Sequence, residues 1–106
     1  MLASVGVTKS RTPRTDEEQS SLNRSLMPVY SRIRQAEGCE GLLVLRDPAT
    51  GEAFTITLWR DRAAMDNGTN AFSEDPVQAE TAQRALEALG IEVVGEPRIY
   101  DVTTNI

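Results

Sequence analysis

The clearest pattern of hydrophobic and polar positions in the chain lies between Gly38 and Trp59. Leu42 to Leu45 is a continuous apolar run, and Ala53 to Trp59 alternates between larger apolar residues and threonines, as a strand with two different faces does. The segment between them, Asp47-Pro48-Ala49-Thr50-Gly51, supplies a side-chain acceptor, a fixed φ and a residue free to take a positive φ. The pattern therefore predicts a β-hairpin whose second strand ends at Trp59.

A first helix is predicted to begin at Thr15. Thr15 and Glu18 have the spacing of a capping box, in which each side chain accepts a hydrogen bond from the other residue's backbone amide. Pro28 interrupts the helical pattern, and because an interior proline costs about 3 kcal/mol, we expect a kink or a break just before it. Gly38 is a natural stop. The apolar residues that recur on one face of this helix are Leu22, Leu26, Val29, Tyr30 and Ile33.

A second long helix is predicted after Asp75-Pro76, which gives an N-cap followed by a proline in the first turn. Its apolar positions, Ala82, Ala85, Leu86 and Leu89, end before Gly90. Between Trp59 and this helix, Asp61 to Met65 has helical character. Asn67-Gly68 and the polar run to Ser73 follow at once, so only a short helix is expected there.

Three further segments have strand character: Leu2 to Thr8, Ile91 to Val94, and Arg98 to Val102. Pro97 lacks an amide donor, which suits a bulge or an edge position. Together with the hairpin and the helices, these strands predict a single domain over residues 1–106, an α+β protein with the ferredoxin-like βαββαβ plan and an antiparallel sheet.

The run from Leu42 to Leu45 is apolar on both of its sides. A sheet with one face in water would alternate instead, so both faces of this sheet are expected to be covered. Helices of the same subunit can cover one face. A second copy of the chain is the economical cover for the other, because most soluble oligomers are two-fold symmetric and a small domain gains much from an extra interface. We therefore expect a homodimer.

The composition argues against several classes of function. The formal net charge is −5, without a cluster of lysines and arginines, so nucleic acid is not an expected partner. No apolar run approaches the ~20 residues needed to span a bilayer, and the N-terminal segment is too short for a secretory signal, so we expect a cytoplasmic protein with no membrane partner. The chain has no histidine and one cysteine, Cys39, so no disulfide within the chain and no metal site are expected.

Four stretches carry a resemblance to a known family: Leu26 to Val29, Glu37 to Gly41, Arg46 to Glu52, and Thr55 to Trp59 followed by Arg60 to Met65. In these stretches the chain resembles the antibiotic biosynthesis monooxygenase-like proteins of the dimeric α+β barrel superfamily. The resemblance implies a head-to-head dimer with a pocket between each sheet and its helices. It also implies, for the quinone-forming members, an oxygenase without cofactor in which a phenol held as its anion passes an electron to O2. The haem-degrading members use a histidine that this chain lacks.

Six residues are candidates for binding a small apolar or aromatic ligand. The resemblance places Trp59 in the wall of the pocket, and Thr55 and Thr57 share its sheet face by the period of two. Each candidate also has a structural interpretation, because a lone tryptophan, a tyrosine on a helix stripe, surface arginines and an Asn-Gly pair are common in packing, ion pairs and turns. No catalytic residue is assigned. The candidates are Trp59, Tyr30, Thr55, Thr57, Arg60 and Asn67.

Three hypotheses about function follow. The first is a cofactor-independent monooxygenase acting on an aromatic or phenolic molecule in a cleft between sheet and helices. The second is a non-catalytic dimeric module that binds a small ligand or serves only for interaction. The third is a haem-binding protein that uses Tyr30 or Cys39 as the ligand, which a spectroscopic titration with hemin would test.

Overall fold

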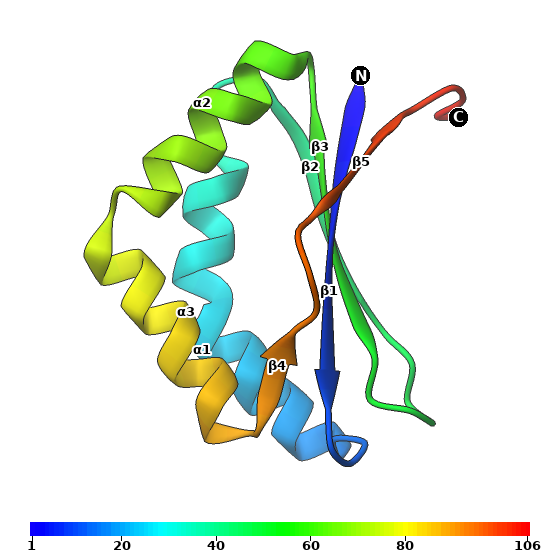
Figure 1. Cartoon of the computed structure of the whole chain (residues 1–106), viewed down its shortest axis with the longest axis vertical. Coiled ribbons are helices and arrows are strands. Elements are labelled where there is room, and N and C mark those ends of the chain that lie inside the picture. Colours follow the sequence, from blue (N-terminus) through cyan, green and yellow to red (C-terminus); the bar gives the residue numbers. More distant parts are fainter.

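The computed structural model describes all 106 residues of the chain. Five strands form one sheet: β1 (Leu2–Ser10), β2 (Cys39–Arg46), β3 (Ala53–Trp59), β4 (Ile91–Val93) and β5 (Arg98–Asp101). Three helices pack on it: α1 (Asp16–Arg34), α2 (Arg62–Ser73) and α3 (Pro76–Ala88). Figure 1 shows the three helices on one side of the sheet and no helix on the other. The predicted ferredoxin-like α+β architecture is confirmed.

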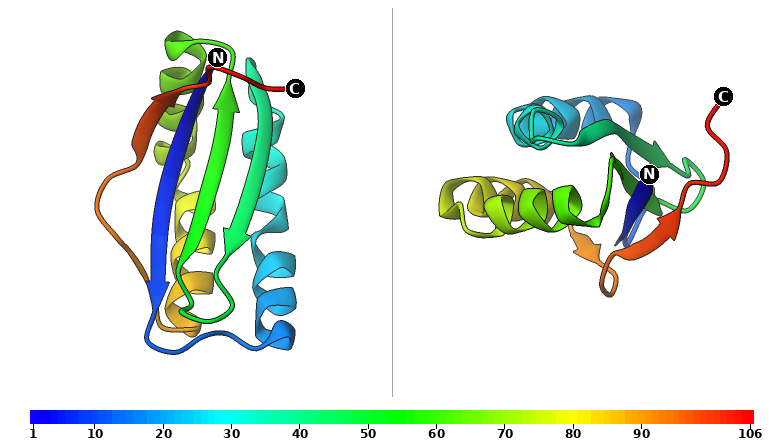
Figure 2. Two further views of the ribbon diagram at one scale, coloured as in Figure 1. Left: turned by 90° about the vertical axis from the view of Figure 1, so that its right-hand side faces the viewer. Right: turned by 90° about the horizontal axis from the view of Figure 1, so that it is seen from above.

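The sheet has the order β2-β3-β1-β4, and all of its pairings are antiparallel. β5 also pairs with β1, beside residues 2–5, whereas β4 pairs beside residues 8–10. β4 and β5 therefore lie in succession along the same side of β1, as Figure 2 shows, and form one interrupted edge strand. Residues 94–97 leave the sheet between them, with Gly95 at φ 67°. Pro97 lies in this break of the edge strand, immediately before β5, and is not part of a central strand.

The capping box at the start of α1 is present as predicted. The Glu18 amide donates to Thr15 Oγ1 at 3.1 Å, and the Thr15 amide donates to Glu18 Oε1 at 3.0 Å. The second contact is the main cause of a lowered pKa for Glu18. Because the folded state favours the ionised carboxylate, this stabilisation is complete above the pKa of an unfolded glutamate and is lost as the pH falls through the lower, folded value.

Removing the cap is expected to destabilise the protein measurably. Thr15→Ala deletes the hydroxyl that accepts from the Glu18 amide, and the loss of such an N-cap costs about 1 kcal/mol. Denaturant unfolding followed by circular dichroism measures this difference. Thr12→Ala is the matched control, since the exposed Thr12 side chain makes no hydrogen bond and its replacement should leave stability unchanged. Equal stability of the two variants would contradict a contribution from the cap.

Two features of the helices differ from expectation: of the kink or break expected before Pro28, the break does not occur, and the short helix expected after Trp59 is long. α1 runs without a break from Asp16 to Arg34, because Pro28 lies on its exposed side, where the carbonyl that has lost its amide partner can bind water. α2 is not short but extends over 12 residues. Asp61 caps it by accepting from the Ala64 amide at 2.8 Å, and Gly68, which lowers helix propensity, lies against the Trp59 ring where a larger residue has no room.

The two faces of the sheet differ in polarity, and the sequence pattern alone does not show which face meets the helices. The register of β1, β2 and β3 groups their alternate residues into two sets. The face toward the helices carries small or polar residues in its central strands: Ser4, Gly6, Thr8, Thr55 and Thr57. The opposite face carries apolar residues almost throughout: Val5, Val7, Leu43, Leu45, Phe54, Ile56 and Leu58.

This apolar set, which we call the outer face, has no cover within the chain. Leu43 is 53% exposed and Leu45 is 49% exposed, as is Tyr100 of β5 at 49%. Figure 2, seen from above, shows only the C-terminal segment on that side of the sheet. The expected cover by a second copy therefore remains a prediction, and the single chain exposes the surface that such a copy would need.

Candidate functional site

A cavity lies between the sheet and the helices, and we call it the inner cavity. Its volume is about 170 Å³. The helix-facing strand residues that line it, such as Thr8, Ala53 and Thr55, are small, which leaves space between this part of the sheet and the helices. Every residue around it except Val44 is buried or half-buried. Eleven of its fifteen lining residues are hydrophobic, counting Tyr30, and the other four are Thr8, Arg14, Gln19 and Thr55.

Arg14 is the only charged residue in this lining. It precedes the cap of α1 and is 7% exposed. Its Nε donates to Gln19 Oε1 at 2.8 Å, which ties the guanidinium to the first turns of α1. Its Nη1 is buried and has no hydrogen-bond partner. The inner cavity therefore contains a fixed cationic donor with unused hydrogen-bonding capacity.

No carboxylate neutralises Arg14. The five salt bridges of the protein do not include it. Glu18 acts on it only weakly through space, and the carboxylate of Glu18 is already bonded to the Thr15 amide. Burial, and then the nearby charge of Arg46, lower the pKa of Arg14. A buried cation without a partner is costly, so this site favours an anion.

Two of the six predicted ligand-binding residues, Tyr30 and Thr55, line the inner cavity together with Arg14. The Tyr30 hydroxyl makes no hydrogen bond to another residue, and burial raises its pKa while the charge of Arg14 opposes the rise. Tyr30 therefore stays protonated near neutral pH and can donate a hydrogen bond. Thr55 adds a second hydroxyl from the floor of the cavity, on β3.

Trp59 and Thr57 share the sheet face of Thr55 but lie outside the lining of the inner cavity. Trp59 is 2% exposed and packs with a separate cluster that contains Cys39, Ala64 and Met65. Its Nε1 donates to Thr57 Oγ1 at 2.8 Å, which satisfies the only polar group of the Trp59 side chain. Trp59 therefore packs in the core in this structure, and a role in binding remains a prediction for both residues.

Arg60 and Asn67 lie together, but at the surface. Both line a shallow depression of about 330 Å³ over the start of α2. Arg60 forms an exposed ion pair with Asp61, with Nε and Oδ2 3.4 Å apart. The structure therefore separates the six candidates: Tyr30 and Thr55 line the inner cavity, Trp59 lies in the core with the half-buried Thr57 beside it, and Arg60 and Asn67 lie at the surface.

A groove adjoins the inner cavity between α1 and the edge strand β2. It measures about 530 Å³, and Met27, Arg34 and Leu42 are among its lining residues. Tyr30 and Val44 line both the groove and the inner cavity, so they form the boundary between the two spaces. Val44 is 36% exposed, which makes this boundary the most open part of the cavity wall.

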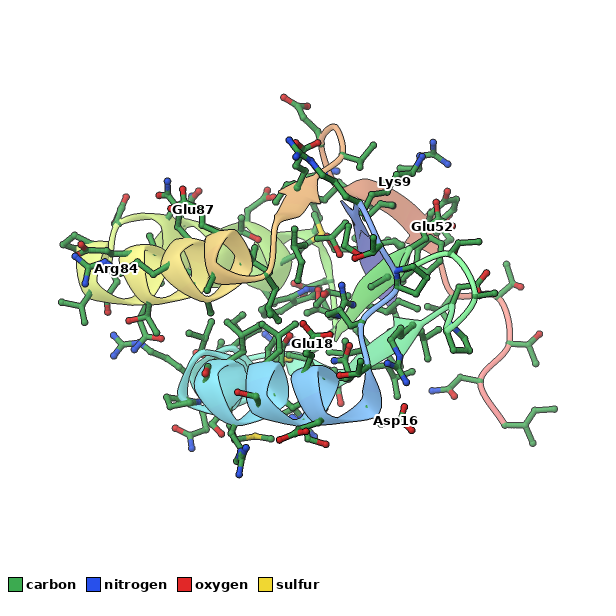
Figure 3. The ribbon with its side chains drawn as sticks, turned by 90° about the horizontal axis from the view of Figure 1, so that it is seen from below. Lys9, Asp16, Glu18, Glu52, Arg84 and Glu87 are labelled. Atoms are coloured by element: carbon green, nitrogen blue, oxygen red, sulfur yellow. The ribbon has the colours of Figure 1, made fainter.

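Sequence reasoning missed Arg14 because it lies in a short polar connector, where an arginine is usually solvated. Its burial depends on the packing of that connector across the end of the sheet, where Arg46 of β2 donates to the Arg14 carbonyl at 3.1 Å. Charged side chains elsewhere are mostly exposed to solvent. Figure 3 shows Arg84 and Glu87 pointing outward from α3, and Asp16 and Glu18 at the start of α1.

No group of three or more histidine, cysteine, aspartate or glutamate side chains is arranged to hold a metal ion. None of the helices has the length and hydropathy of a membrane span. Cys39 is buried beside Trp59, away from Tyr30 and the inner cavity, so the two residues considered as haem ligands do not share a site.

An antiparallel sheet covered by helices on one face defines the ferredoxin-like class of α+β proteins. Within that class, the fold is the one found in solved structures of antibiotic biosynthesis monooxygenases. The resemblance stated from the sequence is thereby confirmed at the level of fold. Neither a protein-family model nor a curated protein matches the chain.

Three solved structures illustrate the likeness. A candidate antibiotic biosynthesis monooxygenase from Deinococcus radiodurans is 22% identical with a TM-score of 0.66, over 100% of this chain and 96% of that one. SnoaB of Streptomyces nogalater, a cofactor-independent oxygenase, is 14% identical with a TM-score of 0.66, over 99% and 95%. The monooxygenase ActVA-Orf6 of Streptomyces coelicolor, in complex with nanaomycin D, is 20% identical with a TM-score of 0.62, over 98% and 87%.

Proposed function

We propose that this protein is a cofactor-independent monooxygenase that oxidises a phenolic molecule bound in the inner cavity. The observation that carries the proposal is the combination of a mostly apolar cavity with one buried, unpaired arginine and a protonated tyrosine. This combination suits a substrate with an aromatic body and one anionic oxygen. Support comes from the shared fold, since SnoaB is a cofactor-independent oxygenase and ActVA-Orf6 is a monooxygenase.

For this chemistry the protein needs only to bind the phenol and to stabilise its ionised form. A phenolate is electron-rich and can reduce O2 directly. One oxygen atom enters a ring carbon as a quinone carbonyl, and the other leaves as water with the two hydrogens that the phenol gives up. The contribution of the cavity is to exclude water and to place donors on the phenolate oxygen, where preorganised hydrogen bonds have their largest effect. Arg14, Tyr30 and Thr55 are the available donors.

Oxygen consumption tests the proposal directly. The protein is incubated with a panel of single-ring, hydroquinone-like phenols, with anthrone-like phenols as larger comparison compounds, and uptake is compared with the rate without protein. We expect catalysed uptake with at least one phenol, and Tyr30→Phe is expected to lower it about 10-fold to 100-fold through loss of one donor. Thr81→Val removes an exposed hydroxyl on α3, away from both the inner cavity and the outer face, and should leave the rate unchanged.

The second candidate function is a non-catalytic module that binds a small ligand. The observation in its favour is that no carboxylate or imidazole lines the inner cavity, so no ordinary general base is present there. Oxygen uptake distinguishes the two candidate functions. Binding of phenols in the inner cavity without oxygen uptake from any member of the panel would favour the module and contradict the oxygenase.

We further propose that the protein acts as a homodimer joined through the outer face. The support is the apolar outer face of β1, β2 and β3, which no helix covers and on which Leu43 and Leu45 are about half exposed. Exposed apolar patches of this kind mark interaction sites. An isologous contact would place the same face of each copy against the other, and would leave both inner cavities on the outside of the paired sheets.

A further inference from the structure

We propose that Arg14 binds the ionised oxygen of the substrate, so that the inner cavity selects a single-ring phenol in its phenolate form. This inference rests on the proposed function, because it names the substrate class of the same site. It assigns a specificity-determining role to a residue outside the six candidates of the sequence.

The state of the Arg14 side chain is the first support. A guanidinium has five N–H donors and is always charged in proteins. Here Nε is used by Gln19, Nη1 is buried without a partner, and no carboxylate forms a salt bridge with the group. Native proteins pair nearly all buried charges, so an unpaired one in a cavity wall indicates the place of a missing anion.

The fixed direction of the guanidinium is the second support. The bond from Nε to Gln19 uses a residue of the first turns of α1, and Gln19 Nε2 in turn donates to Asn23 Oδ1 at 2.9 Å. The Arg14 carbonyl is held separately by Arg46. Both ends of the residue are therefore anchored, and the unused donors need no rearrangement before binding, which is the property that makes a donor effective toward an anion.

The size of the cavity limits the ligand. An engineered cavity of about 150 Å³ in another protein holds one benzene molecule. At about 170 Å³ the inner cavity has room for one aromatic ring with a small substituent, whereas three fused rings would have to extend past Tyr30 and Val44 into the adjoining groove. The surrounding apolar residues, such as Leu22, Leu26 and Leu86, offer no partner for a second charge. The ligand that fits is a single-ring aromatic with one anionic oxygen.

Absorbance of 4-nitrophenol provides a test that does not depend on turnover, because its phenolate is yellow and its neutral form is not. The probe is titrated with the protein at a pH one unit below the pKa of the free phenol. A cation within about 4–6 Å lowers the pKa of an acidic group by 1–3 units, so we expect the acid dissociation constant of the bound probe to rise at least tenfold and at least half of the bound probe to be ionised at this pH.

Three variants separate the role of Arg14 from a structural one. Arg14→Met keeps the length of the side chain and should abolish the shift, while Arg14→Lys keeps the charge and should retain part of it. Arg60→Met removes an exposed arginine and should change nothing. Circular dichroism confirms that each variant is folded. A normal shift in Arg14→Met, or no binding of the probe to the parent, would overturn the inference.

Two neutral or larger probes complete the test. Nitrobenzene, which lacks the acidic oxygen, should bind at least tenfold more weakly than 4-nitrophenol. The three-ring 9-phenanthrol should also bind more weakly, and tighter binding would overturn the size limit. A phenolate shift that depends on Arg14, together with no oxygen uptake, would remove the oxygenase and leave this inference standing. Oxygen uptake that does not depend on Arg14 would support the oxygenase and contradict this inference.

Discussion

Ile56→Glu is expected to convert the protein from a dimer into a monomer of 11.6 kDa. Ile56 lies near the middle of β3 on the outer face, opposite Val5 on one side and Leu43 on the other. In the proposed dimer its side chain would be buried between two sheets. A carboxylate there would lose its hydration without gaining a partner, which costs several kcal/mol and occurs twice in a symmetric interface.

Light scattering at micromolar concentration measures the change, and the parent is expected at twice the mass of the variant. Val77→Glu is the matched control, because Val77 is an apolar residue 68% exposed on α3 and gains the same charge away from the outer face. That control should remain dimeric. A parent that scatters as a stable monomer would contradict the dimer itself, and a dimeric Ile56→Glu variant would exclude the outer face as its interface.

Trp59→Ala is expected to cost about 3–5 kcal/mol of stability, the usual loss when a buried tryptophan is truncated. The ring is 2% exposed and fills the space between the end of β3 and α2. A domain of this size has about 5–15 kcal/mol in total, so the variant is expected to lie near the limit of folding at 37 °C. Denaturant unfolding followed by circular dichroism measures the loss. A loss below 1 kcal/mol would contradict the packing role.

This loss of stability has a practical consequence for the study of function. Reduced activity in Trp59→Ala would not distinguish a binding role from partial unfolding, so Tyr30 and Arg14 are better probes of the site.

Gly68→Ala provides an independent check of the packing. A Cβ at Gly68 would lie 2.7 Å from Trp59 Cζ3, so a substitution that usually stabilises a helix should instead destabilise this one. Asn67→Ala, one residue earlier and exposed, should be neutral or slightly stabilising.

Local patterns were sufficient to predict most of the architecture. The hairpin followed from alternation and a turn of five residues, and the starts of α1 and α3 followed from caps at Thr15 and Asp75 that are present as hydrogen bonds. The absence of a break at Pro28 and the unexpected length of α2 have a common cause. Propensity counts the cost of proline or glycine in an isolated helix, whereas here solvent access at Pro28 and the close contact between Gly68 and Trp59 offset that cost.

The candidate site was predicted only in part, because it depends on which face of the sheet meets the helices. Alternation placed Thr55, Thr57 and Trp59 on the same face of their strand, but a period of two does not show which face meets the helices. The structure places the threonines toward the helices, and Tyr30 meets Thr55 in the inner cavity. Arg14 could not be found from local sequence, since its burial arises from contacts between segments 32 residues apart in the chain.

The two outer edges of the sheet differ in their ability to recruit further strands. On one side, the break at residues 94–97 divides the edge into pieces of three and four residues, and Pro97 offers no amide. Short, interrupted edges of this kind are poor templates for edge-to-edge aggregation. On the other side, β2 presents an edge of eight residues with no proline. If the protein forms fibrils when concentrated or partly unfolded, their growth would begin at β2.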